Sequence, residues 1–195
     1  MDNTQSDLLV LHSLGVSAIP KKAPIVSEVC WHPPIWLKLN TDGLAKGNPG
    51  PTVAGGVFRN CRGFVKGIFS FNIGIQSAFY AELLAVILGI EQAWDKGWFQ
   101  IWLESDSLSV IQCLSNPDFT PPWSLRVRWQ NCKTYLRRMR FQFSHIFREG
   151  NAMADKVANL GVNYLGFQWW SAAPSSLNGL LCRDMCGMTF YRFKS

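Results

Sequence analysis

The hydrophobic pattern of this chain changes its period, and that change limits the folds open to it. Residue types alternate over 37–42 as in a half-buried strand, and two further short strands are expected over 53–59 and 64–71. From residue 80 to 95 the apolar residues recur at helical spacing instead. Consecutive strands with short links pair as an antiparallel meander. The pattern therefore predicts such a meander followed by a helix.

After residue 95 the predicted elements alternate. Strands are expected near 101–103 and over 141–147, and helices over 107–114, 123–139 and 151–160. An antiparallel start followed by alternating strands and helices predicts an α/β fold with a mixed sheet. The prolines of residues 1–34 indicate a flexible leader, residues 35–162 form the predicted domain, and residues 163–195 form a tail without a clean period.

Composition excludes several classes of protein. With 195 residues, 48% apolar and 16% charged, the chain has enough apolar side chains for one core, so general disorder is excluded. No apolar run approaches the roughly 18–20 residues of a membrane-spanning helix. The N-terminus lacks the basic region of a secretory signal. The six cysteines are therefore predicted to be reduced thiols in an intracellular protein, without distinction between nucleus and cytoplasm.

The excess positive charge is concentrated in one segment. The chain carries a net charge of +6, and residues 123–156 hold eight basic and two acidic residues, which accounts for all of it. Such a patch suits a polyanion through phosphate neutralisation. A solvated basic helix face explains the same pattern, and charge alone leaves both interpretations open.

Four acidic residues lie at chemically informative places. Asp42 and Asp106 stand near the ends of predicted strands, whereas Glu82 and Asp155 stand in the first turns of predicted helices. Taken singly, each has an ordinary explanation as a turn or cap residue. Together they predict a cluster at one edge of the sheet, where carboxylates select Mg²⁺ or Mn²⁺. Two such ions support phosphoryl displacement, so the cluster and the basic segment favour a nuclease-like site.

At these acids the sequence resembles type 1 ribonuclease H, and most closely the plant reverse-transcriptase-like ribonuclease H domains related to non-LTR retroelements. The resemblance covers residues 35–162. It implies a ribonuclease H-like fold, with a five-stranded sheet in the order 3-2-1-4-5 and helices on both faces. It also implies Mg²⁺-dependent cleavage of the RNA strand of RNA–DNA hybrids, leaving 5′-phosphate ends. The matching segments, in family order, are KLNTDG (38–43), KGNPGP (46–51), AGGV (54–57), AELLA (81–85), WLESDS (102–107), HIFREGN (145–151) and ADKVAN (154–159).

The resemblance also assigns roles to residues at the predicted site. Asp42, Glu82, Asp106 and Asp155 match the family's metal-binding acids for two ions, with Asp42 contacting both. His145, ten residues before Asp155, matches a mobile histidine that assists proton transfer or product release. Its alternative interpretation is a strand-end histidine without a role.

Further positions are predicted to contact nucleic acid. By resemblance, Gly47, Asn48 and Pro49 match a loop that approaches the RNA strand in the minor groove. Asn151 fits either a helix N-cap or a substrate contact. Within the basic segment, the predicted phosphate-binding residues are Arg137, Arg138 and Arg140.

Four residues depart from the family pattern, namely Leu44, Ala78, Phe79 and Leu108. Their apolar side chains remove expected hydrogen bonds to a hybrid. They support an alternative function, a catalytically weak or inactive nucleic-acid-binding domain left by a retroelement. A plain structural fold with a basic face is a third hypothesis, but it leaves the four acids unexplained. The predicted partner is an RNA–DNA hybrid rather than a membrane, and the predicted state is a monomer.

Overall fold

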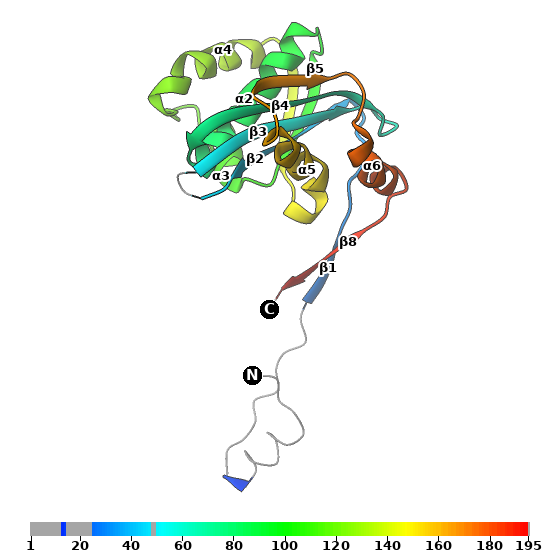
Figure 1. The fold of residues 1–195 in the computed structure, drawn as a ribbon. Helices are drawn as coiled ribbons and strands as arrows, with labels where there is room; N and C mark the ends of the chain where they lie inside the picture. The colour runs from blue at the N-terminus through cyan, green and yellow to red at the C-terminus, as the bar shows by residue number, and fades with distance from the viewer. Residues whose placement is uncertain (1–12, 15–24, 48–49, 195) are drawn as a thin grey trace. The chain divides into compact units, whose positions relative to one another are not determined.

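The computed structural model of the chain describes residues 13–14, 25–47 and 50–194. Its main feature is a mixed sheet in the order β6-β5-β2-β3-β4-β7. Figure 1 labels strands β2 to β5 of this sheet. Neighbours along β2-β3-β4-β7 pair antiparallel, whereas β5 pairs parallel with both β2 and β6. The strands are β2 (Leu37–Ala45), β3 (Gly50–Arg59), β4 (Val65–Gln76), β5 (Gln100–Ser105), β6 (Arg140–His145) and β7 (Gly166–Trp170).

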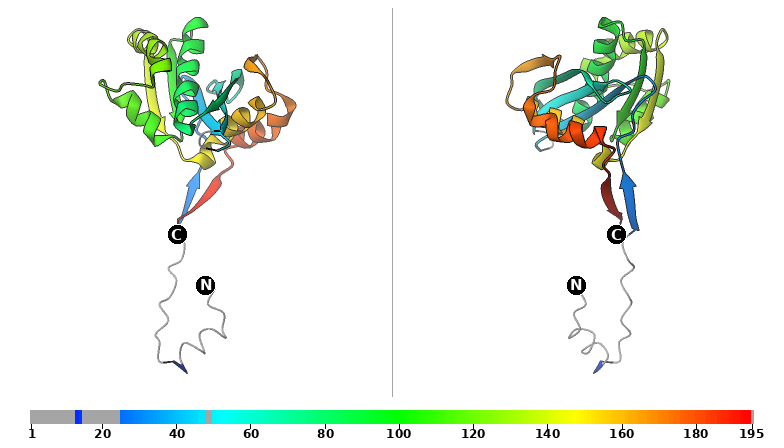
Figure 2. Two further views of the ribbon diagram at one scale, coloured as in Figure 1. Left: turned by 60° about the vertical axis from the view of Figure 1, so that its left-hand side comes forward. Right: turned by 90° about the vertical axis from the view of Figure 1, so that its right-hand side faces the viewer.

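Helices cover both faces of this sheet, as the two views in Figure 2 show. One face carries α2 (Ala78–Asp95), α3 (Leu108–Ser115) and α4 (Arg126–Leu136), and the other carries α5 (Ala152–Gly161) and α6 (Asn178–Met185). Short 3-10 helices precede α4, α5 and α6, namely η1 (Trp123–Leu125), η2 (Arg148–Asn151) and η3 (Ser175–Leu177).

The core has two parts because side chains on a strand alternate between the faces of the sheet. Phe58 and Phe69 are buried with the apolar residues of α2. Their neighbours Val57 and Ile68 are buried on the other side, with Val157 of α5. Leu177, which directly precedes α6, also belongs to this second cluster. The C-terminal segment therefore contributes to the core.

Two glycines let helices approach the strands closely. A Cβ atom at Gly43 of β2 would lie 2.2 Å from the backbone nitrogen of Glu82 in α2. A Cβ atom at Gly55 of β3 would lie 2.9 Å from the backbone nitrogen of Ala158 in α5. Both distances are shorter than a side chain tolerates, so α2 and α5 reach these strands only because glycine is present.

The structure confirms the expected α/β class and extends the sheet. Counted from β2, the first five strands lie in the predicted order 3-2-1-4-5. The segment 163–195, predicted as a tail without a period, adds β7 as a sixth strand beside β4 and also supplies α6. The predicted helix over 123–139 is shorter than expected, because it begins as a 3-10 turn and α4 ends at Leu136.

The described residues fall into two units, one drawn from residues 28–190 and the other from the described parts of 1–27 and 191–195. The strands β1 (Ile25–Val29) and β8 (Phe190–Lys194) pair in a separate two-stranded sheet. Most of the predicted leader lies outside the described residues, but Val29 and Trp31 are described and buried. The predicted domain limits at residues 34 and 162 stay predictions. Within the described part of the chain, no helix has both the length and the apolar character needed to traverse a bilayer.

Candidate metal centre

Two adjacent parallel strands bring Asp42 and Asp106 together. In the register of β2 and β5, Thr41 lies beside Ser105. Asp42 and Asp106 each follow directly in sequence, so they lie at the same end of the sheet. Asp42 is 7% exposed, and the side chain of Asp106 is half-buried. The expected convergence of strand-end acids is therefore present for this pair.

Glu82 joins the pair from the first turns of α2. The helix begins after Ser77, whose hydroxyl accepts a hydrogen bond from the backbone N–H of Tyr80 at 3.2 Å. The close approach at Gly43 then places Glu82 directly against β2. One carboxylate oxygen from each of Asp42, Glu82 and Asp106 lies within 4.8 Å of the other two. We call these three residues the acidic triad.

The acidic triad is electrostatically strained as it stands. Burial, followed by the charges of Asp106 and Asp155, raises the pKa of Asp42 from 3.8 to about 7. Burial, followed by the charges of Asp42 and Asp106, raises the pKa of Glu82 from 4.5 to about 9. In the described structure, the buried Oε2 atom of Glu82 has no hydrogen-bond partner. Clustered oxygens, raised pKa values and an unpartnered buried oxygen together fit a hard divalent cation.

Asp155 lies near the acidic triad but is not part of it. Its Oδ1 atom accepts a hydrogen bond from Nη2 of Arg148 at 3.1 Å, and its Oδ2 atom accepts one from Asn159 at 3.3 Å. Its charge still contributes to the raised pKa of Asp42. Arg148 is thus a cation that competes for this carboxylate, and nothing in the sequence pattern had singled it out.

His145 lies at the expected end of the sheet. It is the last residue of β6 and pairs in register with Ser105, the residue before Asp106. Its side chain is exposed, and its ring meets Phe147 edge-on with centroids 5.7 Å apart. The position suits a group that exchanges protons with solvent near the acidic triad.

Asn151 is the residue that connects the acidic triad to the interior. It precedes α5, but its side chain makes no capping hydrogen bond. Its two amide hydrogens go instead to the carbonyl oxygen of Thr41, at 2.9 Å, and to Oδ1 of Asp106, at 2.8 Å. At 1% exposure it has no donor left for a substrate. Asn151 therefore occupies the expected N-cap position of α5 without a capping side-chain bond, and its contact with a substrate stays a prediction.

The predicted nucleic-acid residues are placed unevenly. Gly47 is exposed with a φ of 109°, whereas Asn48 and Pro49 lie outside the described residues. Arg137, Arg138 and Arg140 are exposed. Arg140 begins β6 and pairs with Gln100, so it lies at the opposite end of the strand from His145, about 17 Å away along the chain. The three arginines are therefore separated from the acidic triad.

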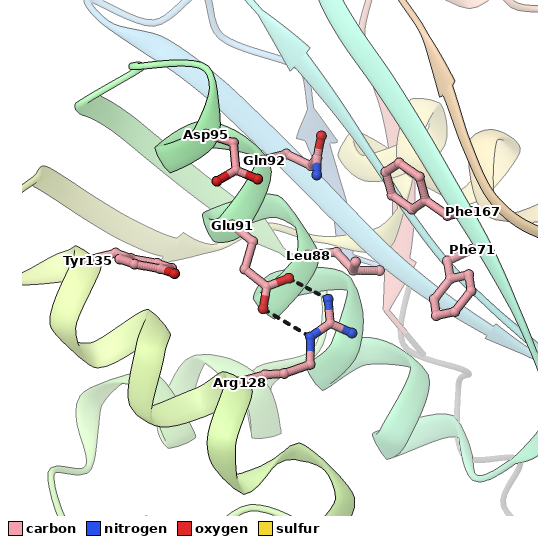
Figure 3. A pocket seen from close by; sticks show the side chains of 8 residues that line it. All are labelled: Phe71, Leu88, Glu91, Gln92, Asp95, Arg128, Tyr135 and Phe167. Carbon is pink, nitrogen blue, oxygen red and sulfur yellow. Dashed lines mark hydrogen bonds and ion pairs between the residues drawn. The ribbon is translucent and has the colours of Figure 1, made fainter.

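A cavity of about 350 Å³ lies apart from the acidic triad, between α2, α4 and the β4–β7 edge (Figure 3). Glu91 of α2 and Arg128 of α4 meet there in a two-point ion pair, in which Nε donates to Oε1 at 2.9 Å. This pair ties α4 to α2. None of the four predicted metal-binding acids lines the cavity.

Comparison with known sequences matches this chain to one family and to two relatives named for ribonuclease H. Residues 40–161 match the family described as Reverse transcriptase-like. A ribonuclease H-named protein of Arabidopsis thaliana is 39% identical over 157 residues, which are 79% of this chain and 25% of that protein. Ribonuclease HI of Halobacterium salinarum is 31% identical over 119 residues, 60% of either chain. The chain thus spans a quarter of the plant relative and somewhat over half of the archaeal one.

Solved structures agree with the sequence comparison. The crystal structure of RNase H1 from Halobacterium salinarum has a TM-score of 0.58 and 29% identity, over 65% of this chain and 97% of that one. LC11-RNase H1, crystallised with an RNA/DNA hybrid, has a TM-score of 0.57 and 25% identity, over 65% of this chain and 96% of that one.

Proposed function

Because the chain belongs to the Reverse transcriptase-like family, we propose that it is a metal-dependent endoribonuclease that cleaves the RNA strand of RNA–DNA hybrids. The observation that carries this proposal is the acidic triad, whose oxygens lie within 4.8 Å of one another and include an unpartnered buried oxygen of Glu82. The relatives named for ribonuclease H support the reaction, and the hybrid in the LC11-RNase H1 crystal supports the substrate.

The proposed ligands of two Mg²⁺ ions, or of Mn²⁺ in their place, are Asp42, Glu82, Asp106 and Asp155. All four offer the oxygen ligands that these hard cations prefer. When bound, the ions activate a water molecule and neutralise charge on the phosphate and the leaving oxygen. The charges of both Asp106 and Asp155 act on Asp42, which supports a central role for Asp42 in the proposed set. To hold a metal ion, Asp155 would have to release Arg148, which now donates a hydrogen bond to it.

His145 supplies proton transfer in the proposed reaction. Its imidazole is exposed beside the residue that precedes Asp106. An exposed imidazole at this place can serve as a general acid or base. The exposed backbone at Gly47 allows close approach of a nucleic acid, and the arginines at 137, 138 and 140 add phosphate contacts along the far end of the sheet.

The experiment is a cleavage assay on the purified full chain. An RNA–DNA hybrid labelled on the RNA strand is incubated with Mg²⁺ or Mn²⁺, and a parallel reaction contains EDTA. Single-stranded RNA, duplex RNA and duplex DNA serve as substrate controls, and Asp106→Asn serves as the protein control. We expect metal-dependent cleavage of the hybrid alone, with 5′-phosphate products, and none by Asp106→Asn. Hybrid cleavage that persists in EDTA contradicts the proposal.

The alternative function is hybrid binding with little or no catalysis. Leu108 favours it, because this side chain is 54% exposed, two residues after Asp106, where a polar group would contact nucleic acid. Phe79 gives weaker support, since it packs against Phe119 and so has a structural role of its own. Hybrid binding without cleavage in either metal selects this alternative. The monomeric state and the location inside the cell also stay predictions.

A further inference from the structure

A fully buried arginine, Arg59, is connected to the acidic triad by hydrogen bonds through Asn40 and Asn151. Arg59, at the end of β3, is 1% exposed and forms an ion pair with Asp184 of α6, which is 6% exposed. The guanidinium also stacks over the ring of Trp31, with 4.1 Å to the ring centroid. Burying such a pair carries a large desolvation cost, so the pair is weak evidence for a stabilising role. The burial of this ion pair therefore needs an explanation other than stability, and the hydrogen bonds of Arg59 supply one.

Arg59 and Trp31 fix the orientation of the Asn40 amide. The Oδ1 atom of Asn40 accepts hydrogen bonds from Nη2 of Arg59 at 2.8 Å and from Nε1 of Trp31 at 3.2 Å. Guanidinium and indole nitrogens only donate, so the Asn40 carbonyl must face them. The Asn40 amide nitrogen then faces the opposite way. It donates to Glu104 at 3.1 Å and to Oδ1 of Asn151 at 3.3 Å.

The fixed Asn40 amide in turn fixes Asn151. Because Asn40 donates to the Asn151 carbonyl, the Asn151 nitrogen faces the other way, where it donates both to the Thr41 carbonyl oxygen and to Asp106. A reversed Asn151 would bring its carbonyl oxygen against the Asp106 carboxylate, which is repulsive. The orientation of each amide therefore constrains the next one, from Arg59 through Asn40 and Asn151 to Asp106. We call these four residues the amide relay.

We propose that Arg59 and Asp184 are positioning residues that hold the Asp106 carboxylate in the orientation that binds metal. The inference rests on the metal site in the proposed function. Asp184 anchors Arg59 from α6, which lies beyond the family match that ends at residue 161. The metal-binding unit therefore includes α6 and Trp31. Residues of this kind behind a metal ligand typically change metal affinity by about 10–100-fold.

The test measures Mn²⁺ binding to the full chain by isothermal titration calorimetry without nucleic acid. The main variant is Arg59→Met with Asp184→Leu, because replacing both members of a buried ion pair with apolar residues preserves folding better than removing one. We expect its Mn²⁺ affinity to fall by about tenfold or more. Asp184→Asn is the milder second variant, since its amide oxygen still accepts from Arg59, and we expect a smaller loss in the same direction.

The matched control is Arg128→Met with Glu91→Leu. This pair also joins an arginine to a carboxylate between two elements, but its hydrogen bonds run between α4 and α2 and do not lead to the acidic triad. We expect its Mn²⁺ affinity to equal that of the unmutated chain. Urea unfolding of every variant reports the stability lost at each site. If the amide relay positions Asp106, the Mn²⁺ affinity falls in the Arg59–Asp184 double variant and in Asp184→Asn. It does not fall in the control pair, even if the control pair loses as much stability.

Two results overturn the inference. Mn²⁺ affinity that is unchanged in both the Arg59–Asp184 double variant and Asp184→Asn shows that the relay does not position Asp106. Equal losses in the double variant and in the control pair show a general effect of destabilisation. Asp106→Asn separates this from failure of the proposed function. If that variant binds Mn²⁺ like the unmutated chain, the metal site itself is wrong.

Discussion

Without a divalent cation, the chain is expected to lose stability as pH rises, and Asp42→Asn is expected to remove the share of that loss that comes from Asp42. The pKa of Asp42 is raised from 3.8 to about 7 by burial and by the charges of Asp106 and Asp155. An aspartate in the unfolded chain keeps a pKa of about 3.9. The folded chain therefore binds this proton more tightly than the unfolded chain. Stability is highest below the unfolded pKa and falls as pH rises through the folded one.

The size of the effect follows from the same pKa values. A tenfold difference in proton affinity corresponds to about 1.4 kcal/mol. The rise from 3.8 to about 7 means that ionising Asp42 in the folded, metal-free chain costs about 4 kcal/mol. Glu82 acts in the same direction, because its pKa is raised to about 9 and part of that rise comes from Asp42. A loss of this size is a large part of the roughly 5–15 kcal/mol that stabilises a typical domain.

The assay is urea unfolding of both proteins in EDTA from pH 5 to pH 8. At pH 8 we expect Asp42→Asn to be the more stable protein by up to about 4 kcal/mol, and at pH 5 by about 2 kcal/mol. Excess Mn²⁺ provides the control. At a hundred times its dissociation constant it stabilises the unmutated chain by about 2.7 kcal/mol and leaves the variant unchanged. A flat pH profile for the unmutated chain, or a variant that is less stable at pH 8, refutes the reasoning.

Three further predictions concern the rest of the site. Replacing Arg137, Arg138 and Arg140 by Gln is expected to weaken hybrid binding and to lower the slope of log affinity against log salt by about 0.9 for each lost phosphate contact. The single-turnover rate at saturating hybrid should not change. An unchanged slope, measured by fluorescence anisotropy, would mean that the three arginines are solvated surface residues without phosphate contacts. His145→Ala is expected to slow single-turnover cleavage by about 10²–10⁴-fold or less while Mn²⁺ affinity is retained. Single-turnover rates equal to those of the unmutated chain from pH 5.5 to 8.5 would remove the histidine from the mechanism. Gly43→Ala is expected to destabilise the chain by about 1–3 kcal/mol or more and to weaken Mn²⁺ binding. The reason is that the alanine Cβ atom would lie 2.2 Å from a backbone nitrogen of α2. An unchanged midpoint of urea unfolding would show that α2 moves to accommodate the methyl group.

Much of the site was accessible from the sequence because its parts are local signals. Asp42 and Asp106 were singled out because each comes near the end of a strand, and parallel neighbours place such residues at the same edge. Glu82 was singled out because it stands in the first turns of a clearly periodic helix. Strand order came from the resemblance to a family, and the structure confirms it. For the three acids, a few neighbouring residues were enough to predict that each lies near the end of a strand or the start of a helix.

The placement of Asp155 and of the basic residues was decided only by the tertiary structure. The sequence groups Asp155 with the other acids, but its carboxylate is turned onto Arg148. The sequence also groups Arg140 with the site through net charge, whereas the register of β6 places it at the end opposite His145. Net charge counts residues without regard to position, so it does not distinguish the two ends of a sheet.

The last segment shows the same limit most clearly. Residues 163–195 have no clean period, and yet they supply β7, α6 and the buried Asp184. Asp184 pairs with Arg59 across 125 positions of the chain. Local pattern fixes which residues favour a strand or a helix, because period and capping depend on near neighbours. Which buried charge meets which partner depends on how distant elements pack together, and this only the folded chain determines.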